Sequence, residues 1–311
     1  MCLNEYLYLN NLNEYEIYCF HETENEKLQL ENTAEFLEIN NIKLKKIIFG
    51  IQYLEPFLNF NEKTFDQIII GNYFTRLHRL FVNYYKPKKI VIVDDGLITL
   101  KLDQEINSKK FKNPYGGSIL IDKILGITNS FKFELFTIFK LKSNSNFNVV
   151  KNNLFYLKKT LIDVCLQKTI IIIGQPLIEK NFTEKPIYLN YLKKIKNKFD
   201  GYKVLYFPSR KESENNIEQI KNTLGFEVIA PEVNIELYLI KYKIFPEQII
   251  GISSTALLTL SLILRKTNIK TKISYHRLLN FKNNNYSSFC LTIYNEFEKI
   301  GIKKLSFENT R

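Results

Sequence analysis

The sequence predicts an α/β protein of two domains, and three observations point to that class. Short apolar runs alternate with longer amphipathic stretches, which is the pattern of parallel β-α units. The chain has 311 residues, which is enough for two domains of roughly 150 residues each. Apolar residues make up 45% of the chain and charged residues 24%, so hydrophobic cores can form and disorder from low hydrophobicity is excluded.

Buried strands in the first half are predicted from short apolar runs. They lie at Glu16–Cys19, Lys46–Phe49, Gln67–Ile70 and Lys89–Val93. A helix is expected from about Tyr73 to Tyr85, because apolar side chains recur there on one face. These side chains are Phe74, Leu77, Leu80 and Phe81. A polar, turn-prone stretch from about Lys142 to Asn153 predicts the boundary, which gives domains 1–150 and 151–311.

The second half repeats the alternation. We expect strands at Thr169–Ile173, Lys203–Phe207, Asn222–Ile229 and Gln248–Ile252. Helices are expected at Pro186–Phe199, from Asn234 to about Tyr242, and at Thr255–Leu264, the last capped by Ser253 or Ser254. Two α/β halves joined by a linker predict a cleft between them, and the final helix is a candidate for packing back on the first domain.

Several classes of protein are excluded by what the sequence lacks. No apolar run approaches the ~20 residues of a membrane-spanning helix, since the best candidate, Gly251–Leu264, is short and carries five hydroxyl residues. The first residues show no signal-peptide pattern. The four cysteines are scattered without CxxC spacing, which argues against a zinc site and a disulfide framework and for a reducing cytoplasm.

The chain is basic, with 44 Lys+Arg against 32 Asp+Glu and a net charge of +12. Its lysine clusters lie beside apolar residues, as on solvated helix faces. The charge also suits an anionic membrane surface or an anionic ligand. Nucleic acid is a distant third interpretation, because no zinc finger or RRM-type motif accompanies the charge. We expect a cytoplasmic protein, with a peripheral position on the inner face of the inner membrane as an option.

Polar residues follow four of the predicted strands, at the edge where ligands bind in open parallel sheets. The groups are Asp94-Asp95-Gly96, Gly174-Gln175-Pro176, Pro208-Ser209-Arg210-Lys211-Glu212 and Ser253-Ser254-Thr255. The serine pair directly precedes an apolar helix, so its hydroxyls and the free backbone N–H groups there can bind an anion such as phosphate. The alternative is a plain helix cap, which needs only one serine.

Asp94 and Asp95 are adjacent carboxylates that point in different directions. One can hold the loop while the other takes a proton from an attacking hydroxyl. A polar turn is the alternative, because Asp-Gly is a common turn dipeptide. A metal pair is a weaker interpretation, because the spacing is not the Asp-x-Asp of metal-dependent nucleotide-sugar enzymes.

Two further groups have both a plain and a functional interpretation. Glu236 falls in the first turn of its helix, where the helix dipole favours a carboxylate in any case, but a carboxylate there can also accept both hydroxyls of a ribose. Ser209, Arg210 and Lys211 form a solvated charged turn or offer a hydroxyl and two cations to a departing phosphate. Neither a Ser-His-Asp arrangement nor a Walker-type loop is visible, which argues against hydrolases and P-loop enzymes.

In their order, these motifs resemble the bacterial lipooligosaccharide sialyltransferases of glycosyltransferase family 52, over most of residues 89–265. The stretches read VDDG from Val93, GQPL from Gly174, YFPSRKE from Tyr206, IELYL from Ile235 and SSTALLTL from Ser253. The resemblance implies a metal-independent GT-B fold, with two Rossmann-like domains facing a central cleft and no cofactor. The first domain would serve the acceptor and the second would bind the nucleotide sugar.

The resemblance also implies roles for individual residues. Asp95 would be the base that deprotonates the acceptor hydroxyl, Glu236 would hold the cytidine ribose, and Ser253 with Ser254 would hold the CMP phosphate. The other donor-site candidates are Gly174, Gln175, Pro208, Ser209 and Arg210. Many relatives carry a histidine where this chain has Ser209, and a serine can donate a hydrogen bond to the leaving phosphate but cannot supply a proton near neutral pH.

We therefore expect an inverting sialyltransferase. CMP-sialic acid would be the donor, and a terminal galactose-type hydroxyl of a bacterial lipooligosaccharide or capsule would be the acceptor. One rival is a protein of the same fold that uses another nucleotide sugar, such as a hexosyltransferase. The other is a weakly active, glycan-binding relative.

Overall fold

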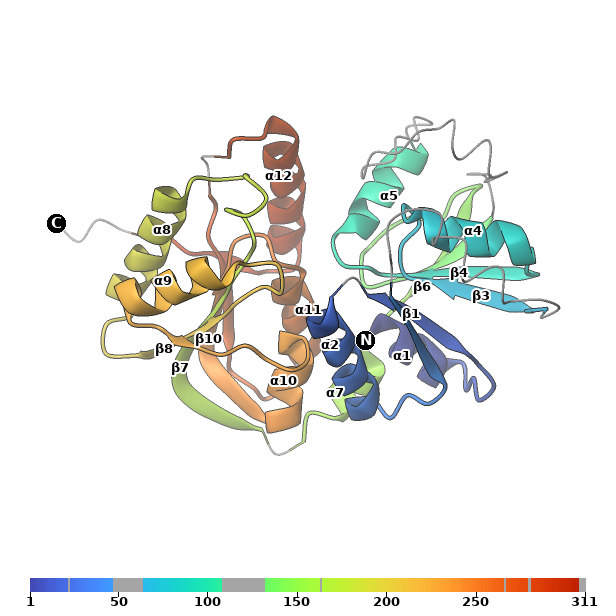
Figure 1. Ribbon diagram of the computed structural model, residues 1–311, viewed down its shortest axis with the longest axis horizontal. Helices are drawn as coiled ribbons and strands as arrows, with labels where there is room; N and C mark the ends of the chain where they lie inside the picture. Colours follow the sequence, from blue (N-terminus) through green and yellow to red (C-terminus); the bar gives the residue numbers. More distant parts are fainter. Residues whose placement is uncertain are drawn as a thin grey trace. The chain divides into compact units, whose positions relative to one another are not determined.

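The structure is a computed structural model that describes residues 1–21, 23–46, 64–107, 132–162, 164–265, 267–278 and 281–307. Contacts divide the chain into two units, each built around a parallel sheet (Figure 1). Unit 1 comprises Met1–Lys27 and Leu37–Leu157, and unit 2 comprises Leu28–Phe36 and Lys158–Arg311.

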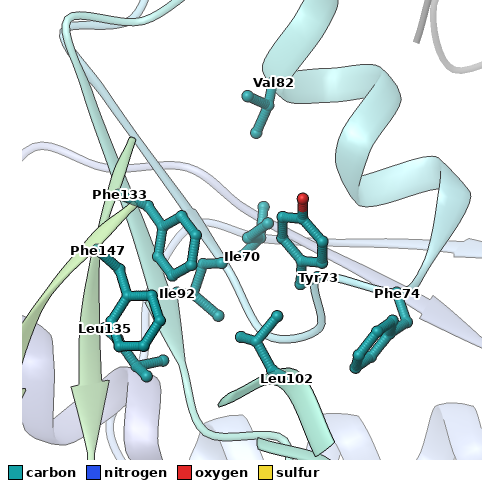
Figure 2. Close-up of a cluster of buried hydrophobic side chains, with 9 residues drawn as sticks. All are labelled: Ile70, Tyr73, Phe74, Val82, Ile92, Leu102, Phe133, Leu135 and Phe147. Carbon is teal, nitrogen blue, oxygen red and sulfur yellow. The ribbon is translucent and has the colours of Figure 1, made fainter. Parts of the chain in front are cut away.

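A four-stranded parallel sheet is the centre of unit 1. Its strands, in spatial order, are β3 (Gln67–Ile70), β4 (Lys89–Val93), β5 (Phe133–Thr137) and β6 (Phe147–Lys151). Figure 2 shows a core cluster of this unit, in which Tyr73 and Phe74 pack with side chains of the sheet. Two helices follow β3 and β4 in the chain, α4 (Arg76–Tyr85) and α5 (Ile98–Asn107). The polar loop that carries Asp94 and Asp95 therefore lies at the carboxyl end of a buried strand.

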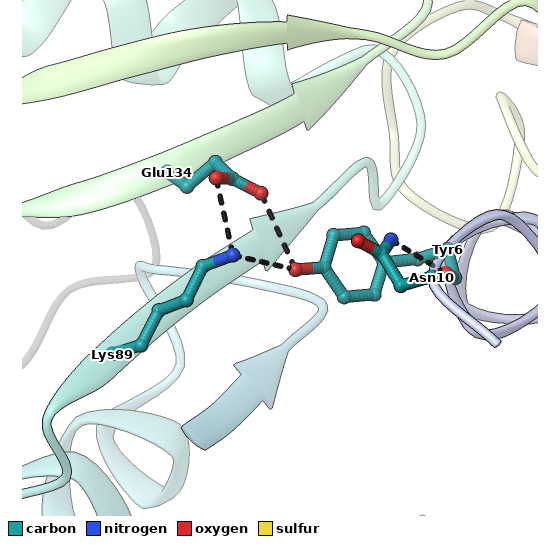
Figure 3. Close-up of polar contacts among 4 residues, drawn as sticks. All are labelled: Tyr6, Asn10, Lys89 and Glu134. Carbon is teal, nitrogen blue, oxygen red and sulfur yellow. Dashed lines mark hydrogen bonds and ion pairs between the residues drawn. The ribbon is translucent and has the colours of Figure 1, made fainter. Parts of the chain in front are cut away.

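Unit 1 also contains N-terminal elements, of which the first strand overlaps the one predicted at Glu16–Cys19 and the helix was not predicted. These are α1 (Cys2–Leu9) and a two-stranded parallel sheet of β1 (Ile17–His21) and β2 (Ile42–Lys46). In Figure 3, the Tyr6 hydroxyl on α1 donates to Glu134 on β5 at 3.3 Å and accepts from Lys89 Nζ on β4 at 3.0 Å. Lys89 and Glu134 form an ion pair at 3.2 Å, which completes a triad. These contacts attach α1 to the main sheet.

The stretch predicted to be the domain linker, residues 142–153, contains a strand of the unit 1 sheet. Residues Phe147–Lys151 form β6, which pairs in register with β5. Phe147 is buried and stacks on Phe133, with ring centroids 5.3 Å apart. The polar residues of this stretch belong to the tight turn before β6, where the Asn144 side chain accepts from the Asn146 amide at 2.8 Å. The chain passes from unit 1 to unit 2 at Leu157 and Lys158, within the short helix α7 (Phe155–Lys159).

A six-stranded parallel sheet forms unit 2, in the order β12-β11-β10-β7-β8-β9. The strands are β7 (Cys165–Ile173), β8 (Lys203–Phe207), β9 (Glu227–Val228), β10 (Ile244–Gly251), β11 (Lys272–Tyr275) and β12 (Lys303–Lys304). Strands β7, β8 and β9 follow one another toward one edge of the sheet, and β10, β11 and β12 follow one another toward the other edge. This is the doubly wound Rossmann order. The winding reverses between β7 and β10. The carboxyl ends of these two strands are therefore the switch point of the sheet, where such folds bind ligands.

Five helices of unit 2 follow the carboxyl ends of its strands, and all of them except α8 begin at a residue whose side chain caps the helix. They are α8 (Lys185–Lys198), α9 (Glu214–Leu224), α10 (Ile235–Tyr242), α11 (Thr255–Leu264) and α12 (Asn284–Lys299). Asn234 caps α10 by accepting from the Leu237 amide at 3.0 Å, and Ser254 caps α11 by accepting from the Ala256 amide at 3.3 Å. The segment Leu28–Phe36 of α2 (Glu24–Phe36) also belongs to unit 2.

Most of the predicted elements are confirmed, and two differ. The strands at Gln67–Ile70, Lys89–Val93 and Lys203–Phe207 and the helix at Thr255–Leu264 have the predicted bounds. Residues 222–224 end α9 and do not start a strand, because Gly225 closes that helix in the left-handed region with φ +62°. Of the strand predicted at 46–49, residue 46 ends β2 and the others lie outside the described residues. The final helix, α12, belongs to unit 2, and its packing on the first domain stays a prediction.

Candidate functional site

The switch point of unit 2 is closed by a direct contact between two of the predicted motifs. Gln175 follows β7 and Ser253 follows β10, 78 residues later in the chain. The Ser253 amide donates to Gln175 Oε1 at 2.8 Å, and Gln175 Nε2 donates to Ser253 Oγ at 3.1 Å. The bonds form because the two parallel strands are neighbours and end at the same level of the sheet. The structure thus brings together two residues that the sequence offered as donor-site candidates.

The beginning of α11 presents polar groups beside this contact. Ser254 is half-buried, and its hydroxyl caps the helix, as the plain interpretation expects. Ser253 is buried, and its hydroxyl also contacts the Tyr286 hydroxyl of α12 at 3.1 Å. Tyr286 in turn stacks on Phe182, with ring centroids 3.7 Å apart. A helix N-terminus carries partial positive charge, so this corner of the sheet can bind an anion next to an aromatic surface.

Gly174 lies against the second loop of the site. A methyl group on its Cα would overlap the Glu212 carboxylate and the Tyr206 hydroxyl, so only glycine fits here. Glu212 is buried, and its carboxylate accepts from the Tyr206 hydroxyl at 2.5 Å and from the Ser209 amide at 2.8 Å. Burial raises the pKa of Glu212 to about 7, while the bonds from Tyr206 and Ser209 oppose that shift.

The loop after β8 carries the other predicted residues of this region. Pro208 ends the strand, and the Ser209 carbonyl accepts from the Glu212 amide at 2.9 Å, which closes a tight turn. The Ser209 side chain is half-buried, whereas Arg210 and Lys211 are exposed. Arg210 and Lys211 therefore fit the interpretation of a solvated charged turn. Ser209 differs from them, because its backbone amide is held by the buried Glu212 carboxylate.

Glu236 is buried in the first turn of α10, with 6% of its surface exposed. Burial raises its pKa, and hydrogen bonds from its own backbone and from the Thr259 hydroxyl lower it. Thr259 lies on α11 five residues after the Ser254 cap, which corresponds to roughly 7.5 Å along the axis. Glu236 therefore lies beside α11, the helix whose N-terminus forms the switch-point site.

The two aspartates of unit 1 are separated by the loop as the sequence predicts. Asp94 is buried and accepts from the Ile138 amide at 2.6 Å, so it holds the loop to the end of β5. Burial raises the pKa of Asp94 to about 6, against opposing bonds from Thr137 and Ile138. Asp95 is exposed, and its Oδ2 accepts from the Asn72 side-chain amide at 2.7 Å. The carboxylate that remains available for chemistry is Asp95.

Behind Asp95 lies a histidine that belongs to none of the sequence motifs. His78 Nδ1 lies 2.9 Å from the Asn72 carbonyl oxygen and 3.2 Å from the Asn72 amide nitrogen. Burial lowers the pKa of His78, and the charge of Asp95 partly opposes this. His78 and Asn72 therefore orient the Asp95 carboxylate. No local pattern marks them, because they come from the loop after β3 and from α4, whereas Asp95 follows β4.

Sequence reasoning also missed the tyrosines of unit 2 that touch the site. Tyr188 and Tyr206 are fully buried and share a hydroxyl contact at 3.0 Å, and Tyr286 reaches Ser253 from α12. Tyr206 stands at the start of the YFPSRKE stretch and could have been noticed there. Tyr188 and Tyr286 read as core positions of helices and carry no signal in sequence alone.

Comparison with known proteins gives a fold but no family. No protein-family model matches the chain, and no curated protein matches it. Among solved structures, it is similar to an α/β-galactoside α-2,3-sialyltransferase from the luminous marine bacterium Photobacterium phosphoreum, with a TM-score of 0.50 and 14% identity. The match covers 95% of this chain and 99% of that one. The chain has a GT-B fold.

The GT-B fold confirms the predicted class of two Rossmann-like domains. A weaker likeness is found to the complex of S. aureus MnaA with UDP, with a TM-score of 0.42 and 11% identity over 92% of this chain and 89% of that one. In the described part of the chain, no helix is long and apolar enough to span a membrane.

Proposed function

We propose that the chain is a glycosyltransferase that uses a nucleotide sugar, and that it is an inverting sialyltransferase of the family 52 type. The observation that carries the proposal is the Gln175–Ser253 contact beside the N-terminus of α11, at the switch point of a Rossmann sheet in a GT-B fold. That position is where such sheets bind nucleotides, and the helix end suits the phosphate.

In the proposed reaction, unit 2 holds CMP-sialic acid. The phosphate would lie against Ser253 and Ser254, with Gln175 releasing or sharing the Ser253 amide when the anion binds. Glu236 of α10, which contacts Thr259 of α11, would accept the ribose hydroxyls. Gly174 and Pro208 would shape the two loops, and Ser209 with Arg210 would face the departing phosphate.

Unit 1 would supply the base. Asp95 takes the proton of a galactose-type hydroxyl on a lipooligosaccharide or capsule, and that oxygen attacks the anomeric carbon of the sialic acid. The bond from this carbon to the CMP phosphate oxygen breaks, and the electron pair leaves with CMP. One displacement inverts the configuration. The new negative charge meets the α11 helix end and Ser209, as a preorganised oxyanion site requires. No metal or cofactor has a role in this scheme.

The test is a thermal-shift panel of CMP, UMP, UDP and GDP, followed by transfer assays with CMP-sialic acid and UDP-hexoses. We expect selective stabilisation by CMP, which Ser254→Ala should reduce. The matched control is Ser213→Ala, which removes an equivalent serine cap from α9. Selective stabilisation by UDP would favour the hexosyltransferase alternative. CMP binding with neither transfer nor donor hydrolysis would favour a glycan-binding relative.

We also propose that the protein binds anionic membranes peripherally, because a glycolipid acceptor would lie there. Exposed lysines support this, including Lys193 and Lys194 on α8 and Lys303 and Lys304 on β12. Vesicles with anionic lipid should sediment the protein at low salt, and the binding should disappear at high salt. Equal sedimentation with neutral vesicles, or none with anionic ones, would reject the idea.

A further inference from the structure

A continuous set of hydrogen bonds, here called the polar chain, runs through unit 2 from the loop after β8 to the loop after β7. Glu212 accepts from the Ser209 amide and the Tyr206 hydroxyl, at 2.8 and 2.5 Å. The Tyr206 and Tyr188 hydroxyls lie 3.0 Å apart, and the backbone amide of Gln175 donates to the Tyr188 oxygen at 3.4 Å. Through the Gln175 side chain, the polar chain reaches Ser253.

The protons in the polar chain can be arranged in one direction only when Glu212 is ionised. A carboxylate only accepts, so Tyr206 must donate to it. Each hydroxyl has one proton, so Tyr206 must then accept from Tyr188, and Tyr188 accepts from the Gln175 amide. All donors point toward Glu212, and its charge strengthens the bonds that end on it.

A neutral Glu212 carries one proton more than the polar chain has acceptors for. If the proton is on Oε2, Glu212 donates to the Tyr206 oxygen, and one of the two tyrosine protons is left without an acceptor in the polar chain. If the proton is on Oε1, that oxygen becomes a hydroxyl and a weaker acceptor for the Ser209 N–H. In both cases the bonds that hold the Gln175 loop and the Ser209 loop together are weakened.

We propose that Glu212 is a positioning residue for the nucleotide-sugar site, and that its ionised carboxylate fixes the Gln175 loop and the Ser209 loop together. This rests on the proposed function of unit 2. Both loops flank the proposed phosphate position, and Gln175 holds the Ser253 amide and hydroxyl. Displacement of the Gln175 loop or the Ser209 loop would therefore move a group that contacts the leaving phosphate in the proposed reaction.

The surroundings of Glu212 place its titration near neutral pH. It faces Tyr206 from β8, Tyr188 from α8 and the carboxylate of Glu179 from the loop after β7. Burial is the largest influence on its pKa, which it raises to about 7, and the charge of Glu179 adds to the increase. Transfer should therefore weaken on acidification through about pH 7, as the polar chain loses its direction.

Glu212→Gln imitates the neutral acid at every pH, because its side-chain amide also carries a donor where the ionised carboxylate only accepts. With CMP-sialic acid as donor, we expect kcat at pH 8 to fall roughly five- to tenfold, the cost of about one misplaced hydrogen bond. The inflection near pH 7 should disappear. The matched control is Glu247→Gln, which alters the bond between Glu247 of β10 and Tyr202 at the amino end of β8 and should retain the wild-type profile.

Hydrogen exchange of the wild type and two variants gives a readout that does not need activity. Tyr206→Phe should expose the Gln175 amide to exchange while leaving the Ser209 amide protected by Glu212. Glu212→Gln should weaken protection of one of these amides at pH 8 without unfolding unit 2. Wild-type kinetics in Glu212→Gln, or wild-type protection of both amides in both variants, would overturn the proposal. If the wild type binds no nucleotide, the proposed function itself fails, whatever the exchange data show.

Discussion

The two loops that carry the proposed chemistry are built in opposite ways. In unit 1, the loop after β4 buries Asp94 as its anchor and leaves Asp95 exposed, with Asn72 as its partner. In unit 2, the loops after β7, β8 and β10 are joined by the polar chain through buried tyrosines and Glu212. A base must meet an incoming hydroxyl and keep a usable carboxylate, whereas a phosphate site benefits from donors fixed in advance. The difference suits the two proposed roles.

Replacing Asp95 should have the largest effect and tests the unit 1 side of the comparison. In Asp95→Asn, the amide cannot take a proton, so transfer should fall at least about 100-fold while CMP affinity is kept. The matched control is Asp94→Asn, which retains an oxygen for the Ile138 amide and should lose far less. Initial rates and calorimetry with CMP measure both. An Asp95→Asn enzyme with more than about a tenth of wild-type turnover would remove Asp95 from the role of base.

The next largest effect is expected in the pH dependence of the free energy of unfolding, to which each unit contributes one buried carboxylate. The pKa of Asp94 is raised from 3.8 to about 6 and that of Glu212 from 4.5 to about 7. The folded chain therefore keeps protons that the unfolded chain has lost, so the free energy of unfolding should decrease as pH rises from about 4 to 7.

Each of these two groups accounts for up to about 3 kcal/mol of that change, at ~1.4 kcal/mol per pKa unit. Chemical denaturation at several pH values measures it. Asp94→Asn should remove the part of the change that ends near pH 6, and Glu212→Gln the part that ends near pH 7. A flat profile in the wild type would show that both carboxylates have the same pKa in the folded and the unfolded chain.

Replacing Glu236 sharpens the comparison within unit 2. Glu236→Gln keeps the shape of the side chain but replaces charge-assisted bonds to the ribose by neutral ones, a difference of about 1 kcal/mol for each bond. We expect CMP affinity to fall about fivefold to tenfold, with a smaller change in turnover at saturating donor. Calorimetry with CMP is the measurement. An unchanged affinity would leave Glu236 as the buried partner of Thr259 and nothing more.

The smallest effect is expected at Ser209, whose loop is already fixed by Glu212. Ser209→His introduces the side chain that many family 52 enzymes carry, and a histidine offers the leaving phosphate a stronger donor or a proton. We expect turnover to rise a few-fold with little change in donor affinity. The gain should depend on a histidine pKa of ~6.5, shifted upward by the phosphate. A variant that is slower at every pH would show that the loop is adapted to serine.

Local sequence determined those parts of the protein whose signals are local. Apolar runs defined β3, β4 and β8, and an apolar helix behind two serines defined α11 and its cap. The split of Asp94 and Asp95 into an anchor and an exposed acid also followed from adjacency alone. By contrast, the polar run before β6 was mistaken for a linker, because a turn and a linker share the same residues.

Only the tertiary structure decided which distant residues meet. Gln175 and Ser253 bond because β7 and β10 are neighbours, and strand order is set by the winding of the whole sheet and not by any one segment. Tyr188 and Tyr206 look like core residues in sequence, because a buried tyrosine occupies the same position in the apolar pattern whether or not its hydroxyl has a partner. Glu212 looked like one charge in a solvated turn. Its burial depends on the space that Gly174 leaves on the neighbouring strand end, and that space exists only after the sheet has formed.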